Sequence, residues 1–181
     1  MKSKEKYVAF LRGINVGGHH KVPMADLRTE LKKINLENVT TLLNSGNVIF
    51  ESEEDNLENK ISDHLEKVFG FPVPVVIRKY GTIAGMLDDN PFEGIEITKD
   101  IRLYVSFLKQ DVSAELKLPW KSPDKSYEII GKTDKTLFSV LDLSVSKTPK
   151  GMDALEKYYG KEITTRNWNT IVRITNKTSA Q

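Results

Sequence analysis

The chain has 181 residues, and its 27 Lys and Arg residues against 25 Asp and Glu residues leave a net charge of +2. This balance gives no overall electrostatic footprint for nucleic acid, although it leaves room for a local basic patch. The absence of cysteine excludes disulfides, thiol chemistry and cysteine-based zinc sites. The apolar run at residues 7–11 is too short for a signal peptide or a membrane span. We therefore expect a cytoplasmic protein that does not enter a membrane.

The first half of the chain predicts a strand at residues 7–12, which ends at Gly13. A glycine-rich loop follows, and Pro23 suits the first turn of a helix. Two further short strands are expected at residues 39–43 and 48–50. The helix after Pro23 carries one apolar stripe, formed by Met24, Leu27, Leu31 and Ile34.

The second helix of this half is expected to begin near Ser52 and Asp55, which resemble a capping pair, and to end at Gly70. A strand at residues 73–78 follows, and Pro74 indicates a sheet edge because proline cannot donate to a strand ladder. The helix has an apolar face formed by Leu57, Ile61, Leu65 and Val68. The predicted order is βαββαβ, the ferredoxin-like motif, with the fourth strand at an edge.

A short helix is predicted at residues 80–87, and the polar, turn-rich residues 88–100 are interpreted as a connector. The strand expected at residues 102–109 is similar to residues 6–12. Four residues of the first strand, Tyr7, Val8, Phe10 and Leu11, recur in order as Tyr104, Val105, Phe107 and Leu108. This similarity suggests that the chain consists of two related halves, residues 1–87 and 101–181.

The rest of the second half supports the repeat. A helix is predicted at residues 114–118, strands at 127–130 and 137–141, and a helix at 152–159. For residues 165–175 the spacing of Trp168, Ile171, Val172 and Thr175, with Thr165 as a cap, favours a helix, while the β-branched content also suits a strand. The sequence thus predicts an α+β fold of two ferredoxin-like halves, the second ending in a helix instead of a final strand.

A candidate site follows from this element order. The loop at residues 13–21 and the turn at 44–47 are expected at the same end of the first sheet. Glycine-rich backbone, with its amides pointing outward, and a helix N-terminus both favour anions, and Arg12 and Lys21 can pair with phosphate or carboxylate. The candidate residues in these loops are Arg12, Asn15, Gly17, Gly18, Lys21, Asn44, Ser45 and Asn47. The alternative is that these residues only turn the chain.

A second polar group surrounds one aromatic residue. Arg166, Asn167 and Asn169 could bind a ligand while Trp168 stacks on it, or Trp168 could pack on the sheet. No metal site, cofactor or catalytic residue is predicted. His19 and His20 are adjacent and point apart in an extended chain.

Three stretches, at residues 11–24, 43–50 and 165–170, resemble the bacterial family known as Domain of Unknown Function 1697 over nearly the whole chain. The resemblance implies two related α+β subdomains in a cytoplasmic protein and implies no activity. Its signature positions include Gly13 and Gly46 in addition to the candidate residues above other than Lys21.

Four functions remain open. The favoured one is binding of a small anionic ligand, such as a nucleotide or phosphorylated metabolite, at the loop rim with Arg166 and Trp168 completing the site. Nucleic-acid binding over the sheet face is a fold-level alternative. An enzyme of unknown class and an interaction module with pairing strand edges are the others. The chain is expected to be a monomer or a small homo-oligomer.

Overall fold

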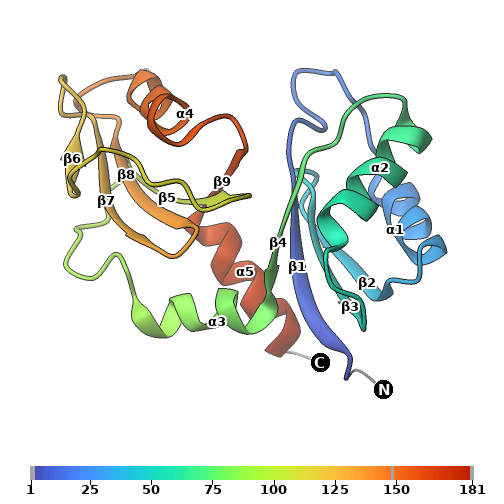
Figure 1. The fold of residues 1–181 in the computed structure, drawn as a ribbon. Helices are drawn as coiled ribbons and strands as arrows, with labels where there is room; N and C mark the ends of the chain where they lie inside the picture. Colours follow the sequence, from blue (N-terminus) through green and yellow to red (C-terminus); the bar gives the residue numbers. More distant parts are fainter. Residues whose placement is uncertain (1–2, 148, 180–181) are drawn as a thin grey trace. The chain divides into compact units, whose positions relative to one another are not determined.

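The computed structural model describes residues 3–147 and 149–179. The chain forms two compact units, Met1–Gly85 and Met86–Gln181, which are described separately here. Each unit contains one antiparallel sheet, and the described residues include five α-helices (Figure 1). The fold is therefore mixed α+β. None of the described helices is long and apolar enough to cross a membrane.

The sheet of the first unit has four strands. These are β1 (Glu5–Leu11), β2 (Glu37–Leu42), β3 (Asn47–Ser52) and β4 (Val75–Lys79), arranged in the order β2-β3-β1-β4. All neighbouring pairs are antiparallel. Strand β4 lies at an edge, as the preceding Pro74 predicted. Phe10 lies opposite Asn47 and Leu11 opposite Val75, so the end of β1 is fixed between β3 and β4.

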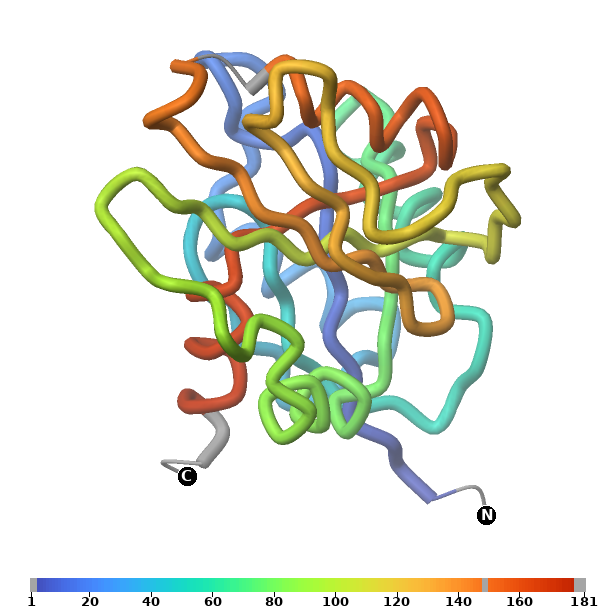
Figure 2. The backbone as a smooth tube through the Cα atoms, turned by 90° about the vertical axis from the view of Figure 1, so that its left-hand side faces the viewer, coloured from blue at the N-terminus to red at the C-terminus, as the bar shows by residue number. Residues whose placement is uncertain are grey.

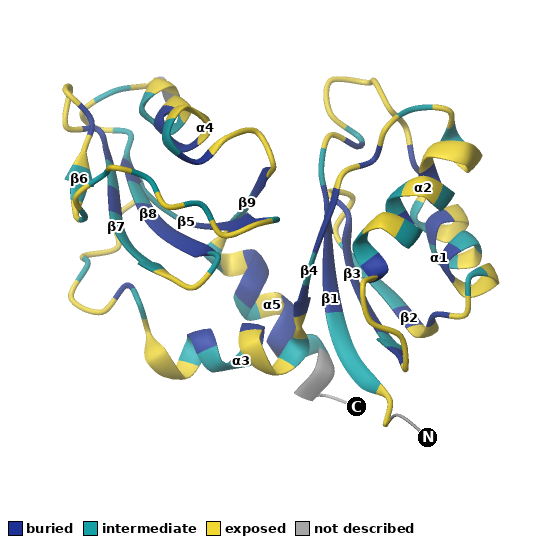
Figure 3. Ribbon diagram, in the orientation of Figure 1, coloured by how far each residue is buried: buried dark blue, intermediate teal, exposed yellow. Residues whose placement is uncertain are grey.

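Two helices cover one face of this sheet, α1 (Met24–Lys33) and α2 (Leu57–Phe69) (Figure 1). Their inward sides are buried and their outward sides are exposed (Figure 3). The buried residues recur at helical spacing as Leu27 and Leu31 in α1 and as Leu57, Ile61 and Leu65 in α2. They join Ala9, Leu11 and Phe50 of the sheet in one core. This arrangement fixes the start of α1 beside the end of β1.

The predicted capping pair of Ser52 and Asp55 is wrong. Helix α2 begins at Leu57, after Asn56, which has a left-handed backbone. The Ser52 hydroxyl oxygen instead accepts a hydrogen bond of 3.0 Å from the backbone N–H of Glu54. A serine side chain can bond a nearby amide in a turn as well as in a helix cap, and Ser52 makes the turn bond. The predicted end at Gly70 is confirmed, since this residue has a φ of 79°.

Helix α3 (Tyr80–Asp89) continues the chain into the second unit. The sheet there has the order β6-β7-β8-β5-β9. Its strands are β5 (Ile101–Leu108), β6 (Trp120–Lys121), β7 (Tyr127–Thr133), β8 (Thr136–Asp142) and β9 (Ile163–Asn167). The 3-10 helix η1 (Pro149–Met152) leads directly into α4 (Asp153–Tyr159), and α5 (Trp168–Ser179) ends the described chain.

The helix predicted at residues 114–118 does not form. The backbone between β5 and β6 is an irregular segment without helix or strand (Figure 2). Exposure alternates along it, and every second residue is half-buried against the core of this unit. These half-buried residues are Val112, Ala114, Leu116, Leu118 and Trp120. A period of two indicates extended chain, and Pro119 further disfavours a helical Leu118.

The prediction that the second unit has a helix in place of a final strand is also wrong, although the helix expected from the spacing of Trp168, Ile171, Val172 and Thr175 does form. Residues 163–167 form β9, which pairs antiparallel with β5, and α5 begins only at Trp168. The β-branched run Ile163, Thr164 and Thr165 suits a pleated strand. Thr165, expected to cap the helix, instead shares a hydrogen bond of 2.7 Å with Ser106 across the sheet. The pairing covers a strand edge that β5 would otherwise expose.

Candidate functional site

The loop after β1 is a small hairpin. The backbone N–H of Asn15 donates to the carbonyl oxygen of His20 at 3.0 Å, and that of His19 donates to Val16 at 3.0 Å. Gly17 and Gly18, at the tip, have φ values of 59° and 79°. Two central residues with positive φ are the signature of the tightest hairpin turns, and glycine adopts that backbone at least cost. The two glycines therefore have a local structural role.

Asn15 holds the base of this hairpin closed. Its side-chain Oδ1 accepts a hydrogen bond of 2.8 Å from the backbone N–H of Val22. Its Nδ2 donates to the carbonyl oxygens of Val22, at 3.0 Å, and of Asn44, at 2.8 Å. The residue also has a left-handed backbone, with a φ of 55°, which asparagine tolerates better than most residues. All these bonds link parts of the backbone, so the amide of Asn15 acts as a brace.

The turn between β2 and β3 lies against the same brace. The backbone N–H of Leu11 donates to the carbonyl oxygen of Gly46 at 2.8 Å. The buried side chain of Asn47 donates to the carbonyl oxygen of Leu42 at 2.9 Å and to the Ser45 hydroxyl at 3.0 Å. The two loops are therefore neighbours at one end of the sheet, the arrangement that the element order predicts.

Gly46 has no room for a side chain. Its φ is 82°, and a Cβ atom there would lie 2.8 Å from both Ile14 Cδ1 and Leu11 Cβ. Such distances are too short for non-bonded carbon atoms, which pack at about 3.5–4.0 Å. The close approach of the two loops therefore requires glycine at this position.

His20 fixes the other side of the hairpin. Its ring stacks on Phe71, with ring centroids 4.3 Å apart and an interplanar angle of 14°. Its Nδ1 lies 3.1 Å from the carbonyl oxygen of Gly13. Because a carbonyl only accepts, Nδ1 carries the hydrogen. A loop that is bonded at its base, its tip and its side is largely pre-formed.

An open depression of about 410 Å³ lies beside the hairpin, where α1 begins. Lys21 is the only charged residue among those that line it. Its side chain is exposed, and no ion pair within the described residues involves it. The lining consists of Asn15, Gly18, Lys21, Val22, Pro23, Met24 and Asn44. The depression thus has one cation, no carboxylate and an apolar wall.

Four of the eight residues predicted in these loops line the depression, namely Asn15, Gly18, Lys21 and Asn44. The other four, Arg12, Gly17, Ser45 and Asn47, lie outside the lining. Arg12 is half-buried, and its backbone N–H donates to the carbonyl oxygen of Pro74 at 2.9 Å. The sequence reasoning missed the apolar wall of Val22 and Met24. The only sequence signal near this wall was Pro23, which predicted the start of α1.

The second predicted group lies in the other unit. Trp168, at the start of α5, is half-buried and meets Phe92 edge-on, with ring centroids 5.2 Å apart and an interplanar angle of 67°. Arg166, on β9, donates to Thr164 Oγ1 at 2.9 Å and to the carbonyl oxygen of Thr165 at 3.0 Å. Burial lowers the pKa of the Arg166 guanidinium to about 10. Asn167 and Asn169 are exposed. The contact of Trp168 with Phe92 supports the packing alternative for this ring.

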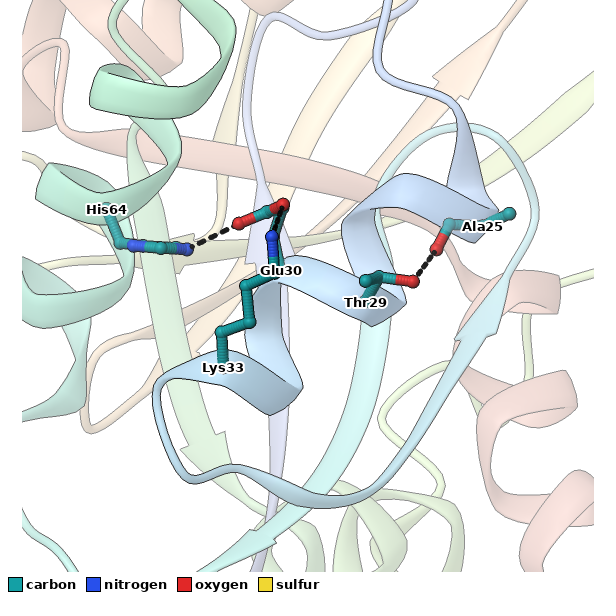
Figure 4. Close-up of polar contacts among 5 residues, drawn as sticks. All are labelled: Ala25, Thr29, Glu30, Lys33 and His64. Atoms are coloured by element: carbon teal, nitrogen blue, oxygen red, sulfur yellow. Dashed lines mark hydrogen bonds and ion pairs between the residues drawn. The ribbon is translucent and has the colours of Figure 1, made fainter.

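Glu30 links the two helices of the first unit (Figure 4). Its carboxylate accepts a hydrogen bond from Lys33 at 2.6 Å and lies 3.0 Å from His64 Nε2 on α2. The Lys33 hydrogen bond lowers the pKa of Glu30, burial opposes this, and His64 adds to the lowering. His64 is thus a partner of a carboxylate between helices. Within the described residues, no group of three or more His, Asp or Glu side chains could hold a metal ion.

Known proteins resemble this chain both in sequence and in structure. A family model described as "Protein of unknown function (DUF1697)" matches residues 4–138, which is most of the chain and includes both loops. The chain belongs to this family. The Arg166–Asn169 group lies beyond the matched residues.

One similar solved structure is "The structure of conserved bacterial protein SP0830 from Streptococcus pneumoniae". It is 25% identical in sequence, with a TM-score of 0.68 over 96% of this chain and 98% of that chain. Among curated proteins, none matches. The family's description and this neighbour's name specify no activity.

Proposed function

We propose that the first unit binds a small anionic ligand in the depression beside the hairpin of residues 13–22. The observation that carries the proposal is the charge of the lining, in which exposed Lys21 faces no carboxylate. The volume of about 410 Å³ is within the range of small-molecule sites. The hairpin is pre-formed, so little ordering entropy opposes binding.

The start of α1 supports the same ligand charge. The first intrahelical bond runs from the Leu27 N–H to the Pro23 carbonyl oxygen, so the amides before Leu27 have no acceptor inside the helix. The partial positive charge at this end favours an anion. Asp26, in the first turn, offsets part of that charge. Lys21 is therefore the side chain on which affinity is expected to depend most.

The test is a binding titration of the full-length protein with inorganic phosphate, AMP and citrate, followed by ¹H–¹⁵N NMR. The amides of Gly18, Lys21 and Met24 are expected to shift on titration. Lys21→Gln is expected to weaken binding about tenfold, since a charge-assisted hydrogen bond contributes about 1.5 kcal/mol. The matched control is Lys32→Gln, which removes an exposed lysine from the last turn of α1, at the opposite end of that helix from the depression. Unchanged spectra with all three anions would refute the proposal.

We also infer that both units are ferredoxin-like halves derived from one duplicated motif. Two pairs of equivalent backbone hydrogen bonds support this. The Leu11 N–H donates to Gly46 at 2.8 Å, and the Leu108 N–H at the same place in β5 donates to Lys135 at 2.9 Å. The next residue in each strand also matches. The Arg12 N–H donates to Pro74 at 2.9 Å, and the Lys109 N–H donates to Glu162 at 3.0 Å.

A further inference from the structure

We infer that the ligand of the depression is a phosphate monoester that carries an apolar group, rather than a bare oxyanion. This inference rests on the proposed function and specifies the class of ligand. The inference starts from the apolar wall of the depression, which contrasts with the charged Lys21. This wall consists of Val22, Pro23 and Met24. A small oxyanion bound at Lys21 leaves most of a volume of about 410 Å³ unused.

Each of the two loops carries an exposed apolar residue next in sequence to a residue that lines the depression. Val16 follows Asn15 in the hairpin and is 69% exposed, and Leu43 precedes Asn44 in the turn and is 44% exposed. In the described part of the chain, only three other large apolar residues are this exposed: Val68, Ile97 and Val145. Two of the five therefore lie next to lining residues in sequence, one on each loop.

Leu43 is also held in a backbone conformation that leucine disfavours. Its φ is 60°, in the left-handed region that favours glycine and asparagine. A non-glycine residue there costs about 1 kcal/mol or more. At 44% exposure the Leu43 side chain is only partly covered within the unit, so its burial there does little to offset this cost. Contact with the apolar part of a ligand would supply that burial, and it would leave the anionic part at Lys21.

The experiment compares inorganic phosphate, methyl phosphate and phenyl phosphate, titrated into the full-length protein and followed by NMR. Phenyl phosphate is expected to bind about tenfold more tightly than inorganic phosphate, since burying about 55 Å² of apolar surface has that effect. Leu43→Asn keeps a residue that tolerates the left-handed backbone and removes the apolar side chain. It is expected to remove most of this preference. Val68→Thr, on the exposed side of α2, is the control and should leave the preference intact.

The outcomes separate this inference from the proposed function. Equal affinity for phosphate and phenyl phosphate, both dependent on Lys21, would overturn the ligand class and leave an anion site. A preference for phenyl phosphate that survives Leu43→Asn would also overturn it. If none of the three compounds shifts the amides around Lys21, both the inference and the proposed function are wrong.

Discussion

The side-chain amide of Asn15 donates a hydrogen bond of 2.8 Å to the carbonyl oxygen of Asn44, across 29 residues of sequence. This bond joins the hairpin after β1 to the turn between β2 and β3. The same amide group bonds both backbone polar groups of Val22. One side chain therefore determines how two loops meet, and the shape of the depression depends on it.

Asn15→Ala is expected to lower the free energy of unfolding of the first unit by about 2–3 kcal/mol. The substitution removes three hydrogen bonds and leaves the Val22 N–H without its acceptor. Asn38→Ala is the matched control, because Asn38 also has a left-handed backbone, with a φ of 50°, and makes an exposed hydrogen bond. The control should cost about 1 kcal/mol. Urea unfolding, followed through NMR signals of the first unit, measures the free energy of unfolding of both variants. Equal losses would contradict the role of Asn15 as a brace.

Gly46→Ala is expected to destabilise the first unit by about 2–4 kcal/mol, because it adds strained backbone and a steric overlap. The added Cβ would lie 2.8 Å from Leu11 Cβ. Gly18→Ala separates the two effects. Its φ is 79°, but a Cβ there meets nothing within 4 Å. It should cost about 1 kcal/mol in the same urea experiment, and a loss as large as that of Gly46→Ala would show that crowding is not the cause.

The Glu30 carboxylate gives a prediction about pH. Its pKa is lower in the folded state than the ordinary value of 4.5, mainly because Lys33 donates a hydrogen bond to it. A depressed pKa stabilises the folded state above the unfolded pKa, and this contribution is lost as the pH falls through the folded pKa. Glu30→Gln should therefore be less stable than wild type at pH 7, and the difference should shrink as the pH falls below the ordinary pKa of 4.5 and through the folded-state pKa.

The two partners of Glu30 can be separated by ¹³C NMR titration of its carboxyl carbon. Lys33→Met is expected to raise the pKa of Glu30 more than His64→Gln does, because the Lys33 hydrogen bond is the larger cause of the lowering. Lys67→Met, in the last turn of α2, serves as a control for the loss of one positive charge. A larger rise in the His64 variant would reverse the assignment.

Trp168→Ala is expected to destabilise the second unit by about 2 kcal/mol, because it removes the edge-on contact with Phe92 and leaves a cavity. Trp168→Phe keeps an aromatic ring and should recover at least half of that loss. Asn169→Ala, at the exposed neighbouring position, should change nothing measurable. Chemical unfolding followed by NMR signals of the second unit compares the three. A neutral Trp168→Ala would favour a surface role for this ring.

The first unit was largely predictable because each of its signals acts locally. The helical spacing of Leu27 and Leu31 predicted α1, Gly70 predicted the end of α2, and Pro74 predicted an edge strand. The neighbouring loops followed from element order alone. The role of Asn15 could not be predicted, because its partners, the backbones of Val22 and Asn44, carry no mark in the sequence.

The second unit shows where local patterns mislead. Residues 114–118 are short and of mixed propensity, and the period-two alternation from Val112 to Trp120 was the better signal. Residues 163–167 became a strand because β5 offers them an edge, which is a tertiary effect that spacing does not reveal. The apolar wall of the depression was missed for a related reason. In the sequence Val22 and Met24 resemble ordinary core residues, and only the folded loop beside them shows that they line the depression.

The hairpin after β1 is closed twice, at its base by Asn15 and nearer its tip by the bond between His19 and Val16. The side chains of Val16 and His19, at the two ends of the tip, can therefore be exchanged without disturbing the frame that carries them, while Gly17 and Gly18 supply the positive φ that the turn requires. A library that varies only these two positions, with Asn15, Gly17, Gly18 and His20 kept, would display new pairs of side chains on an unchanged scaffold.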